Sequence, residues 1–216
     1  MKKYHMSFLL VSAIGLTSHV QANENAKLTI NKNNIKVWTI QNSDSPILSY
    51  RAETVVDTTL ERAAAIVIDV DHAKSWVPNV ASAQLLSQDL KQGDFKLYMV
   101  LDFPFPLKDR DLIVQGKMYK DAKGIIHIKN KASQTGKAKN PNYIRLKQYV
   151  GDWSFEQLTE NKVRVTTSGY ANPEGIIPQS VTNMFVQQQP YQMLKKMKIE
   201  LAKPQTQEIK LPEILK

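Results

Sequence analysis

The sequence predicts an α+β fold in which a curved antiparallel sheet wraps around one long C-terminal helix. Two observations predict it. Segments of alternating polar and apolar residues recur between residues 35 and 170, as they do in antiparallel strands. A single long segment at 178–201 instead carries apolar residues at helical spacing, including Val181, Leu194 and Leu201.

The first elements are two strands and a helix. Strands are expected at 35–41 and 47–56, after a polar loop at 31–34 that leads into the first of them. A helix is expected at 58–70, because its apolar residues fall on one side and either Asp57 or Thr58 can cap its start.

A longer series of strands follows this helix. Turn-forming residues separate the apolar segments at spacings that are typical of an antiparallel meander. The expected strands are 82–88, 95–103, 111–119, 124–131, 143–150, 153–158 and 162–170.

Alternation within these strands predicts a sheet with one apolar face and one basic face. In the strand at 95–103, for example, Leu97 and Met99 lie opposite Lys96 and Tyr98. Antiparallel sheets commonly place one face on the core and the other in water. The remaining segment that can cover the apolar face is the C-terminal helix, and a curved sheet held around such a helix is the helix-grip arrangement.

Four short motifs resemble a known family. They are Trp76-Val77-Pro78-Asn79-Val80 after the first helix, Arg110-Asp111 at a strand start, Gly151-Asp152-Trp153 at another, and the turn from Asn172 to Pro178 before the last helix. In this order they resemble the START family (StAR-related lipid transfer). The resemblance covers residues 47–201, and the overall pattern is similar to the bacterial, exported branch of the family.

The resemblance implies an internal apolar tunnel under the long helix that binds one lipid or similar hydrophobic molecule. It also implies two gating elements, the loop before the Arg-Asp strand and the helix itself. The residues assigned to the cavity or its lid are Met99, Leu101, Phe103, Phe105, Leu107, Val114, Gly116, Met118, Gln148, Thr167, Val181, Met184 and Phe185. Trp76, Arg110, Asp111 and Trp153 are assigned structural roles.

Several of these residues have two interpretations. The apolar, proline-rich loop at 103–107 is either a lid that touches ligand or membrane, or a plug of the core. Gln148 and Thr167 interrupt the expected apolar face, so each needs a partner from a ligand or a buried water. Sterol-binding members are expected to carry a buried charge at the position of Gly116, which disfavours a sterol here. Pro190 within the last helix is either a hinge or a fixed bend.

The N-terminus has the pattern of a secretory signal peptide. Lys2 and Lys3 precede an apolar stretch at 6–16, and Ala22 is a suitable cleavage site. An uncleaved anchor is the alternative. Residues 1–22 are therefore expected to be removed, 23–204 to form a single START-like domain and 205–216 to form a loose tail, in a monomeric periplasmic or secreted protein.

The charge is strongly positive, and there is no cysteine. The formal net charge is +9, and the segment 117–147 holds nine Lys or Arg against one acid, Asp121. In an exported protein this segment favours transient contact with an anionic membrane surface over nucleic acid, and a solvated basic face is the alternative. The absence of cysteine excludes disulfides, thiol catalysis and cysteine-based metal sites. No cofactor, metal site or catalytic residue is expected.

The sequence thus predicts a protein that binds and transfers a lipid or other hydrophobic molecule in an internal tunnel. One alternative is a helix-grip enzyme of the cyclase or aromatase type, which needs an acid or base that points into the cavity. The other is a basic membrane-surface adaptor without a ligand. Activity as an enzyme is not expected, because only Gln148 and Thr167 are polar on the expected inner face.

Overall fold

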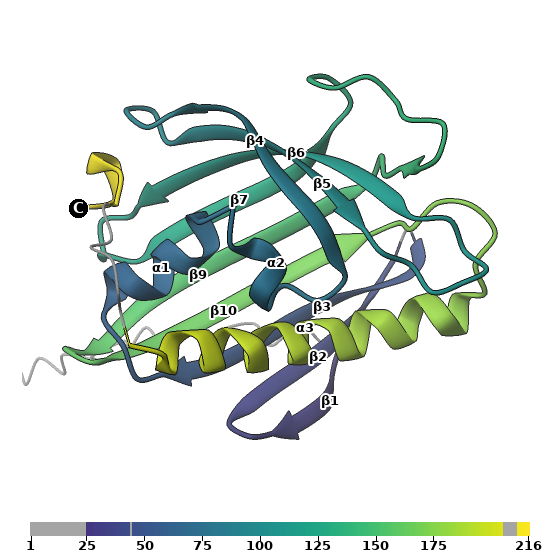
Figure 1. Cartoon of the computed structure of the whole chain (residues 1–216). Coiled ribbons are helices and arrows are strands. Elements are labelled where there is room, and N and C mark those ends of the chain that lie inside the picture. Colours follow the sequence, from purple (N-terminus) through teal and green to yellow (C-terminus); the bar gives the residue numbers. More distant parts are fainter. Residues whose placement is uncertain (1–24, 44, 205–210) are drawn as a thin grey trace, which may run out of the picture.

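A computed structural model describes residues 25–43, 45–204 and 211–216. One sheet of ten strands curves around a single long helix, α3 (Gln179–Ala202), as Figure 1 shows. The predicted helix-grip fold is confirmed. The strands are β1 (Ala26–Lys32), β2 (Ile35–Asn42), β3 (Ser45–Val56), β4 (Val80–Asp89), β5 (Asp94–Leu101), β6 (Arg110–Lys120), β7 (Ile126–Ser133), β8 (Ile144–Arg145), β9 (Tyr149–Thr159) and β10 (Lys162–Ala171).

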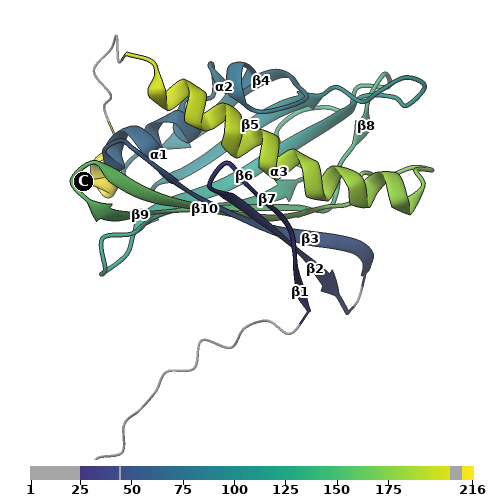
Figure 2. The same ribbon diagram turned by 90° about the horizontal axis from the view of Figure 1, so that it is seen from below.

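The sheet has the order β1-β2-β3-β10-β9-β7-β6-β5-β4, with the short β8 beside β6. All pairings are antiparallel except that of β8 with β6. Figure 2 shows α3 running across one side of this sheet. The short helices α1 (Leu60–Ile68) and α2 (Ala73–Trp76) lie on the same side, so the helices and the sheet enclose one interior.

The main core lies between the sheet, α1 and the second half of α3. Leu194 and Met197 of α3 are fully buried there against Ile128, Phe155 and Val165 of the central strands. Complete burial of such side chains is worth about 1.5–3 kcal/mol each, so this region supplies much of the stability.

The N-terminal strand β1 was not predicted. Residues 31–34 were expected to form a loop, but the turn consists only of Asn33 and Asn34, with φ of 56° and 58°. Asparagine tolerates this left-handed conformation better than most residues. β1 lies at the edge of the sheet and most of its residues are exposed, so its sequence lacks the alternation that marks a half-buried strand.

The predicted strand at 143–150 is wrong. Ile144 and Arg145 form the short β8, and residues 146–148 are in no strand. Tyr149 and Val150 already belong to β9, which continues through the separately predicted strand at 153–158. Arg145 is one of the nine basic residues of the segment 117–147, for which a solvated basic face was one interpretation, but it is buried in an ion pair with Asp111. An isolated arginine in an apolar segment gives no sequence signal for a buried partner that is distant in the chain.

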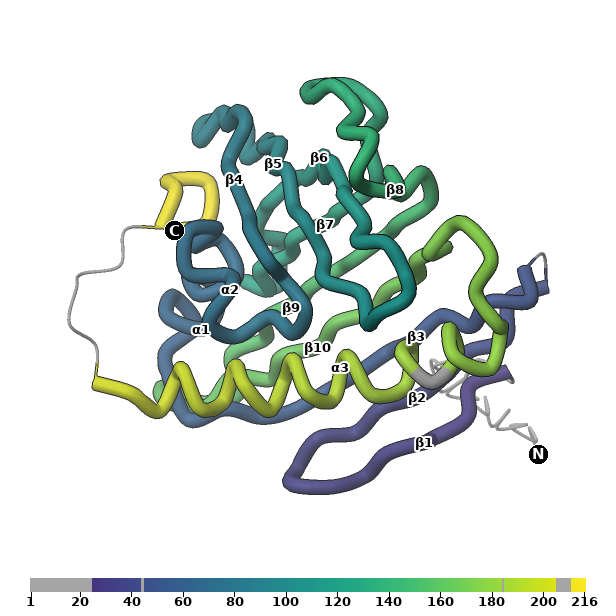
Figure 3. The backbone as a smooth tube through the Cα atoms, turned by 45° about the vertical axis from the view of Figure 1, so that its right-hand side comes forward, coloured from purple at the N-terminus to yellow at the C-terminus, as the bar shows by residue number. Residues whose placement is uncertain are grey.

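Two ends of elements also differ from the prediction. The helix predicted at 58–70 is shorter, and Thr59 caps it by accepting a hydrogen bond from the backbone N–H of Arg62. The tail predicted to be loose packs instead on the protein where it is described. Leu211 and Leu215 are buried, and the 3-10 helix η1 (Glu213–Leu215) lies against β6. Figure 3 shows the C-terminus at the same end of the molecule as α1.

The predicted signal peptide at 1–22 and residues 205–210 of the predicted tail lie outside the described residues. Within 25–43, 45–204 and 211–216, no helix is both long enough and apolar enough to span a membrane.

Candidate ligand-binding site

A row of paired residues that includes three glycines crosses the inner face of the sheet from strand to strand. Each member of the row pairs directly with the next across the backbone ladder. In order, the row contains Tyr50, Gly169, Gly151, Asn130, Gly116 and Phe95. Three glycines on adjacent or nearby strands leave the middle of the sheet without side-chain bulk.

Aromatic rings fill the space above these glycines. A Cβ added to Gly151 would lie 2.1 Å from the hydroxyl oxygen of Tyr149, and one added to Gly116 would lie 2.0 Å from Cζ of Phe95. Both distances are far below van der Waals contact. The glycines therefore let the rings lie against the sheet, and any larger residue would push the rings into the interior.

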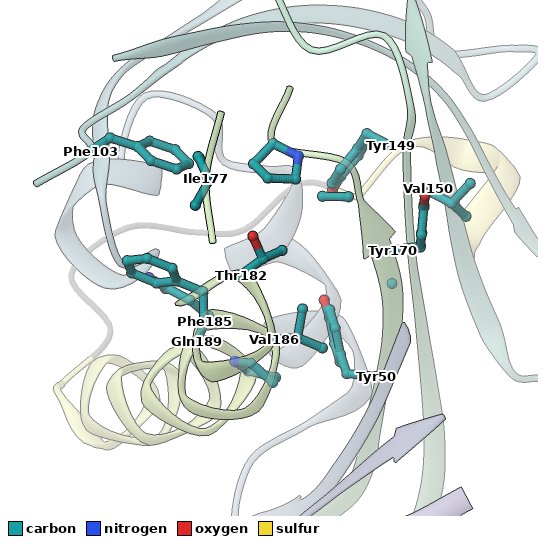
Figure 4. Close-up of a pocket in the computed structure, with 14 residues that line it drawn as sticks. Tyr50, Phe103, Tyr149, Val150, Tyr170, Ile177, Thr182, Phe185, Val186 and Gln189 are labelled. Carbon is teal, nitrogen blue, oxygen red and sulfur yellow. The ribbon is translucent and has the colours of Figure 1, made fainter. Parts of the chain in front are cut away.

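One pocket lies between this part of the sheet and the first half of α3, and we call it the α3 pocket. Its volume is about 160 Å³. Figure 4 shows Phe185, Val186 and Gln189 of α3 facing Tyr50 across it, with Phe103 and Ile177 at another side. Its full lining is Tyr50, Phe103, Tyr149, Val150, Gly169, Tyr170, Ala171, Pro173, Ile177, Thr182, Phe185, Val186, Gln189 and Pro190.

A second pocket lies between α2 and strands β4 to β9, and we call it the α2 pocket. Its volume is about 110 Å³. It is lined by Val67, Val70, Ala73, Trp76, Val77, Ala83, Phe95, Leu97, Met99, Val114, Ile128, Asn130, Tyr149, Trp153 and Met193. Trp76 and Trp153 pack edge to face in its wall, with ring centroids 5.9 Å apart.

Tyr149 lines both pockets. The expected tunnel is thus two pockets that share the Tyr149 side chain. Burial raises the pKa of its hydroxyl well above the usual value, so this group is neutral at physiological pH. Pockets for drug-sized ligands are typically ~300–1,000 Å³. Neither pocket reaches this size alone, so a ligand of that size requires both and a movement of Tyr149.

The polar groups in this interior are neutral. No charged side chain lines either pocket in the part of the chain that the structure describes. Three buried polar atoms have no hydrogen-bond partner among the described residues. They are Nε1 of Trp76, Oδ1 of Asn130 and Oγ1 of Thr167. Native proteins satisfy most such atoms, so these three mark positions where a partner is missing.

Arg110 connects two loops at one end of the α3 pocket. Its guanidinium donates hydrogen bonds to the carbonyl oxygens of Lys108, Pro173 (3.0 Å) and Glu174 (3.1 Å). It also lies 4.1 Å from the centroid of the Phe103 ring. The residue is buried, and it joins the loop between β5 and β6 to the loop between β10 and α3. Both loops lie at the right-hand end of Figure 1.

The two phenylalanines of the first loop have different environments. Phe103 lines the α3 pocket and packs on Phe185, with ring centroids 6.0 Å apart. Phe105 is 97% exposed, and Ile176 on the second loop is 100% exposed. The alternative in which both rings plug the core is therefore wrong for Phe105. Two large apolar side chains on adjoining loops form an exposed apolar tip, which we define as Phe105 and Ile176.

Asp111 faces the other side of the sheet. Its carboxylate accepts two hydrogen bonds from Arg145, at 2.8 and 2.7 Å, and one from the Tyr98 hydroxyl at 3.1 Å. Burial, with the Asp111 charge beside it, raises the pKa of Tyr98 to about 12. Arg145 also donates to the carbonyls of Lys137 and Ala138. Arg110 and Asp111 each hold loops on the sheet by charge-assisted bonds, on opposite faces.

The residues that the sequence assigned to the cavity or lid fall into several groups. Met99, Val114, Phe103 and Phe185 line the two pockets, while Gly116 lies beneath the ring of Phe95. Thr167 and Met118 are buried in the sheet but line neither pocket, and Leu101, Leu107 and Val181 are partly buried outside them. The side chain of Met184 lies outside the described residues.

Gln148 was expected to interrupt the inner face, and this placement is wrong. Its side chain is exposed and accepts hydrogen bonds from the Tyr170 hydroxyl and from Asn172. The error follows from the strand predicted at 143–150. Because β9 begins only at Tyr149, the alternation of its faces cannot be extended back to Gln148.

Sequence reasoning missed many residues of this site, among them Tyr50, Asn130, Tyr149, Gly151 and Gly169. Asn130 could have been predicted from the sequence, because it lies on the same face as Ile126 and Ile128 in the strand predicted at 124–131. Gly151 was noticed only as part of the Gly151-Asp152-Trp153 motif and Gly169 gave no signal, since only the strand register shows that the two are neighbours.

The basic segment 117–147 is partly neutralised by acids from other strands. Lys117 lies 3.2 Å from Asp94, and Lys129 lies 2.8 Å from Asp152. Since Arg145 is also paired and buried, the segment presents less free positive charge than its composition indicates.

Comparisons with known proteins agree with this architecture. The family model described as the START domain matches residues 19–206. An uncharacterized protein of Pseudomonas aeruginosa is 27% identical over 190 residues, which cover 88% of this chain and 93% of that protein.

Two solved structures share the fold. A fragment of a STAR-related lipid transfer protein from Xanthomonas axonopodis has a TM-score of 0.77 at 23% identity, with 83% of this chain and all of that chain covered. The Zhui aromatase/cyclase from Streptomyces is similar at a TM-score of 0.53 and 11% identity, covering 71% of this chain and 92% of that one.

Proposed function

This chain belongs to the START family, a family of lipid-binding domains, and from that premise we propose that it binds one lipid or other hydrophobic small molecule and transfers it between membranes. The observation that carries the proposal is the pair of uncharged pockets that meet at Tyr149 between α3 and the sheet. Apolar surroundings of this kind favour a ligand that leaves water by the hydrophobic effect.

We propose that the exposed apolar tip is the part that contacts the membrane. Phe105 and Ile176 expose nearly their whole side chains next to the α3 pocket, and Arg110 holds the loops of both. The transfer of exposed apolar groups from water into the interfacial region of a bilayer lowers the free energy. A ligand could then pass between the membrane and the α3 pocket without crossing water.

The lining argues against an enzyme. General acid–base catalysis needs a titratable group within reach of the ligand, with a pKa near the working pH. Within the described residues, the titratable side chains that line the pockets are tyrosines. Burial raises the pKa of Tyr50 and of Tyr149, so neither is a base at neutral pH. We therefore propose a binding protein rather than a cyclase-like enzyme.

We further propose that the protein is exported and acts as a monomer in the periplasm or outside the cell. The support is the signal-peptide pattern at 1–22, together with a bacterial relative and a bacterial structural neighbour. The paired lysines at 117–147 support only a secondary role for charge in membrane contact.

Native mass spectrometry of the purified protein and vesicle-to-vesicle transfer of the lipid identified in it test this function. We expect one ligand per chain. The double variant Phe105→Asp with Ile176→Asp should keep the ligand but transfer it roughly tenfold more slowly, which corresponds to about 1.4 kcal/mol of lost membrane contact.

Leu90→Asp is the matched control, because Leu90 is also an exposed apolar residue but lies in the turn between β4 and β5. Its transfer rate should equal that of the unaltered protein. A protein that carries no ligand and takes up no fatty acid, phospholipid or sterol probe would contradict the proposal.

A further inference from the structure

The α2 pocket contains a hydrogen-bond donor and an acceptor that lack partners. The indole N–H of Trp76 and the side-chain oxygen of Asn130 are both buried without a hydrogen bond among the described residues. Both residues line the same pocket, Trp76 from α2 and Asn130 from β7. The remainder of the lining is apolar, apart from the hydroxyl of Tyr149 and the indole N–H of Trp153.

We infer that Trp76 and Asn130 form a subsite for an uncharged hydroxyl group of the bound ligand. A hydroxyl both accepts and donates, so a single group can accept from the indole N–H and donate to the amide oxygen. A carbonyl or ether oxygen can only accept, and it would leave the acceptor of Asn130 without a partner.

Charged head groups, such as a carboxylate or a phosphate, do not suit this pocket. A carboxylate or phosphate group is costly to bury unless a cation or several donors compensate it. The residues that line the α2 pocket include no lysine, arginine or histidine. A ligand with a charged head group would therefore have to leave that group outside the α2 pocket.

The α3 pocket suits the rest of the same ligand. It is lined almost entirely by apolar and aromatic groups, and its buried Thr182 hydroxyl is already directed to the carbonyl of Pro178 at 3.5 Å. Tyr149 lines both pockets, so a ligand that passes this ring has its hydroxyl beside Trp76 and its apolar part beside Phe185. This inference rests on the proposed function and names the chemical class of the ligand.

Displacement of a fluorescent apolar probe by matched ligands tests the inference. The ligands are a saturated long-chain primary alcohol, its methyl ether and the carboxylic acid of the same chain length. We expect the alcohol to bind about tenfold more tightly than the ether, because the alcohol makes one additional buried hydrogen bond. The acid should bind more weakly at neutral pH than the alcohol.

Asn130→Leu removes the acceptor at similar size and should reduce the preference for the alcohol over the ether to near one. Trp76→Phe removes the donor and is the second variant, in case the first does not fold. Thr167→Val is the matched control, because it removes a buried hydroxyl that lines neither pocket and should leave the preference unchanged.

The outcomes separate this inference from the proposed function. Equal affinity of the unaltered protein for alcohol and ether, or a preference that survives both Asn130→Leu and Trp76→Phe, would overturn the hydroxyl subsite while lipid binding stands. If none of the three ligands displaces a probe, and the protein also lacks a co-purified ligand, both proposals fail together.

Discussion

The two halves of α3 make different contacts with the same sheet. In the second half, Leu194 and Met197 are fully buried in the main core. In the first half, Phe185 and Val186 face the α3 pocket and are only partly buried. One half therefore holds the helix on the sheet, and the other half borders the space that a ligand would occupy.

Pro190 stands where these two halves meet. It lies inside a helix that continues to Ala202, and it also lines the α3 pocket. Proline has no N–H, so the carbonyl of Val186 lacks its usual helical partner at this point. The difference between the halves teaches that the contacts that stabilise the fold and the space for a ligand are separated along one helix, with one helical hydrogen bond missing between them.

Leu194→Ala and Phe185→Ala test this separation most strongly. Leu194→Ala should lower the free energy of unfolding by about 2–5 kcal/mol, because it leaves a cavity in the packed core. Phe185→Ala should lower it by much less, since this side chain already borders an unfilled pocket. Chemical denaturation of both variants measures the difference. Equal losses would mean that both halves anchor the helix.

Pro190→Ala sharpens the comparison. Alanine restores an N–H that can bond to the carbonyl of Val186, so the unfolding free energy should rise by up to about 3 kcal/mol. The stiffer first half should also release a bound fluorescent lipid several-fold more slowly than the unaltered protein in a stopped-flow experiment. If stability rises and the release rate stays the same, Pro190 is a fixed bend and not a hinge.

The smallest expected effect on stability concerns an exposed ion pair near the second half of α3, the half that is held on the sheet. Lys162 donates to Asp57 at 2.7 Å, and this hydrogen bond lowers the pKa of Asp57 below its usual value of about 3.9. A lowered pKa in the folded state contributes stability above that value, and the contribution is lost as the pH falls through the folded pKa. Asp57→Asn should therefore be less stable than the unaltered protein at neutral pH, and the difference should vanish in acid.

Asp71→Asn is the control for this experiment, since Asp71 is exposed and has no ion pair among the described residues. Denaturation curves of the three proteins from neutral to acidic pH measure the effect. A difference between Asp57→Asn and the unaltered protein that persists at low pH would show that the ion pair is not its cause.

Much of the fold could be predicted from local patterns. The long helix, most of the strands and the helix-grip arrangement follow from periodicity, because one face of each element is buried. The failures have a common reason. β1 is an exposed edge strand, and the segment at 143–150 is shaped by the ion pair between Arg145 and Asp111. Neither feature produces a local alternation.

The candidate site was less predictable than the fold. Four pocket residues could be predicted from their position in a local element. The strand face indicates Met99 and Val114, the apolar loop indicates Phe103, and the helix indicates Phe185. Tyr149 could not be predicted in this way, because its importance depends on the space above Gly151.

By itself, the sequence determined the helix-grip fold and the motifs that place the chain in the START family, because buried faces and turn residues leave periodic signals. Only the tertiary structure decided which side chains meet. Strand register aligned Gly169, Gly151 and Gly116 in one row, and packing of α2 on the sheet placed Trp76 and Asn130 around one pocket. Register and packing depend on contacts between residues that are distant in the chain, and a local pattern cannot encode them.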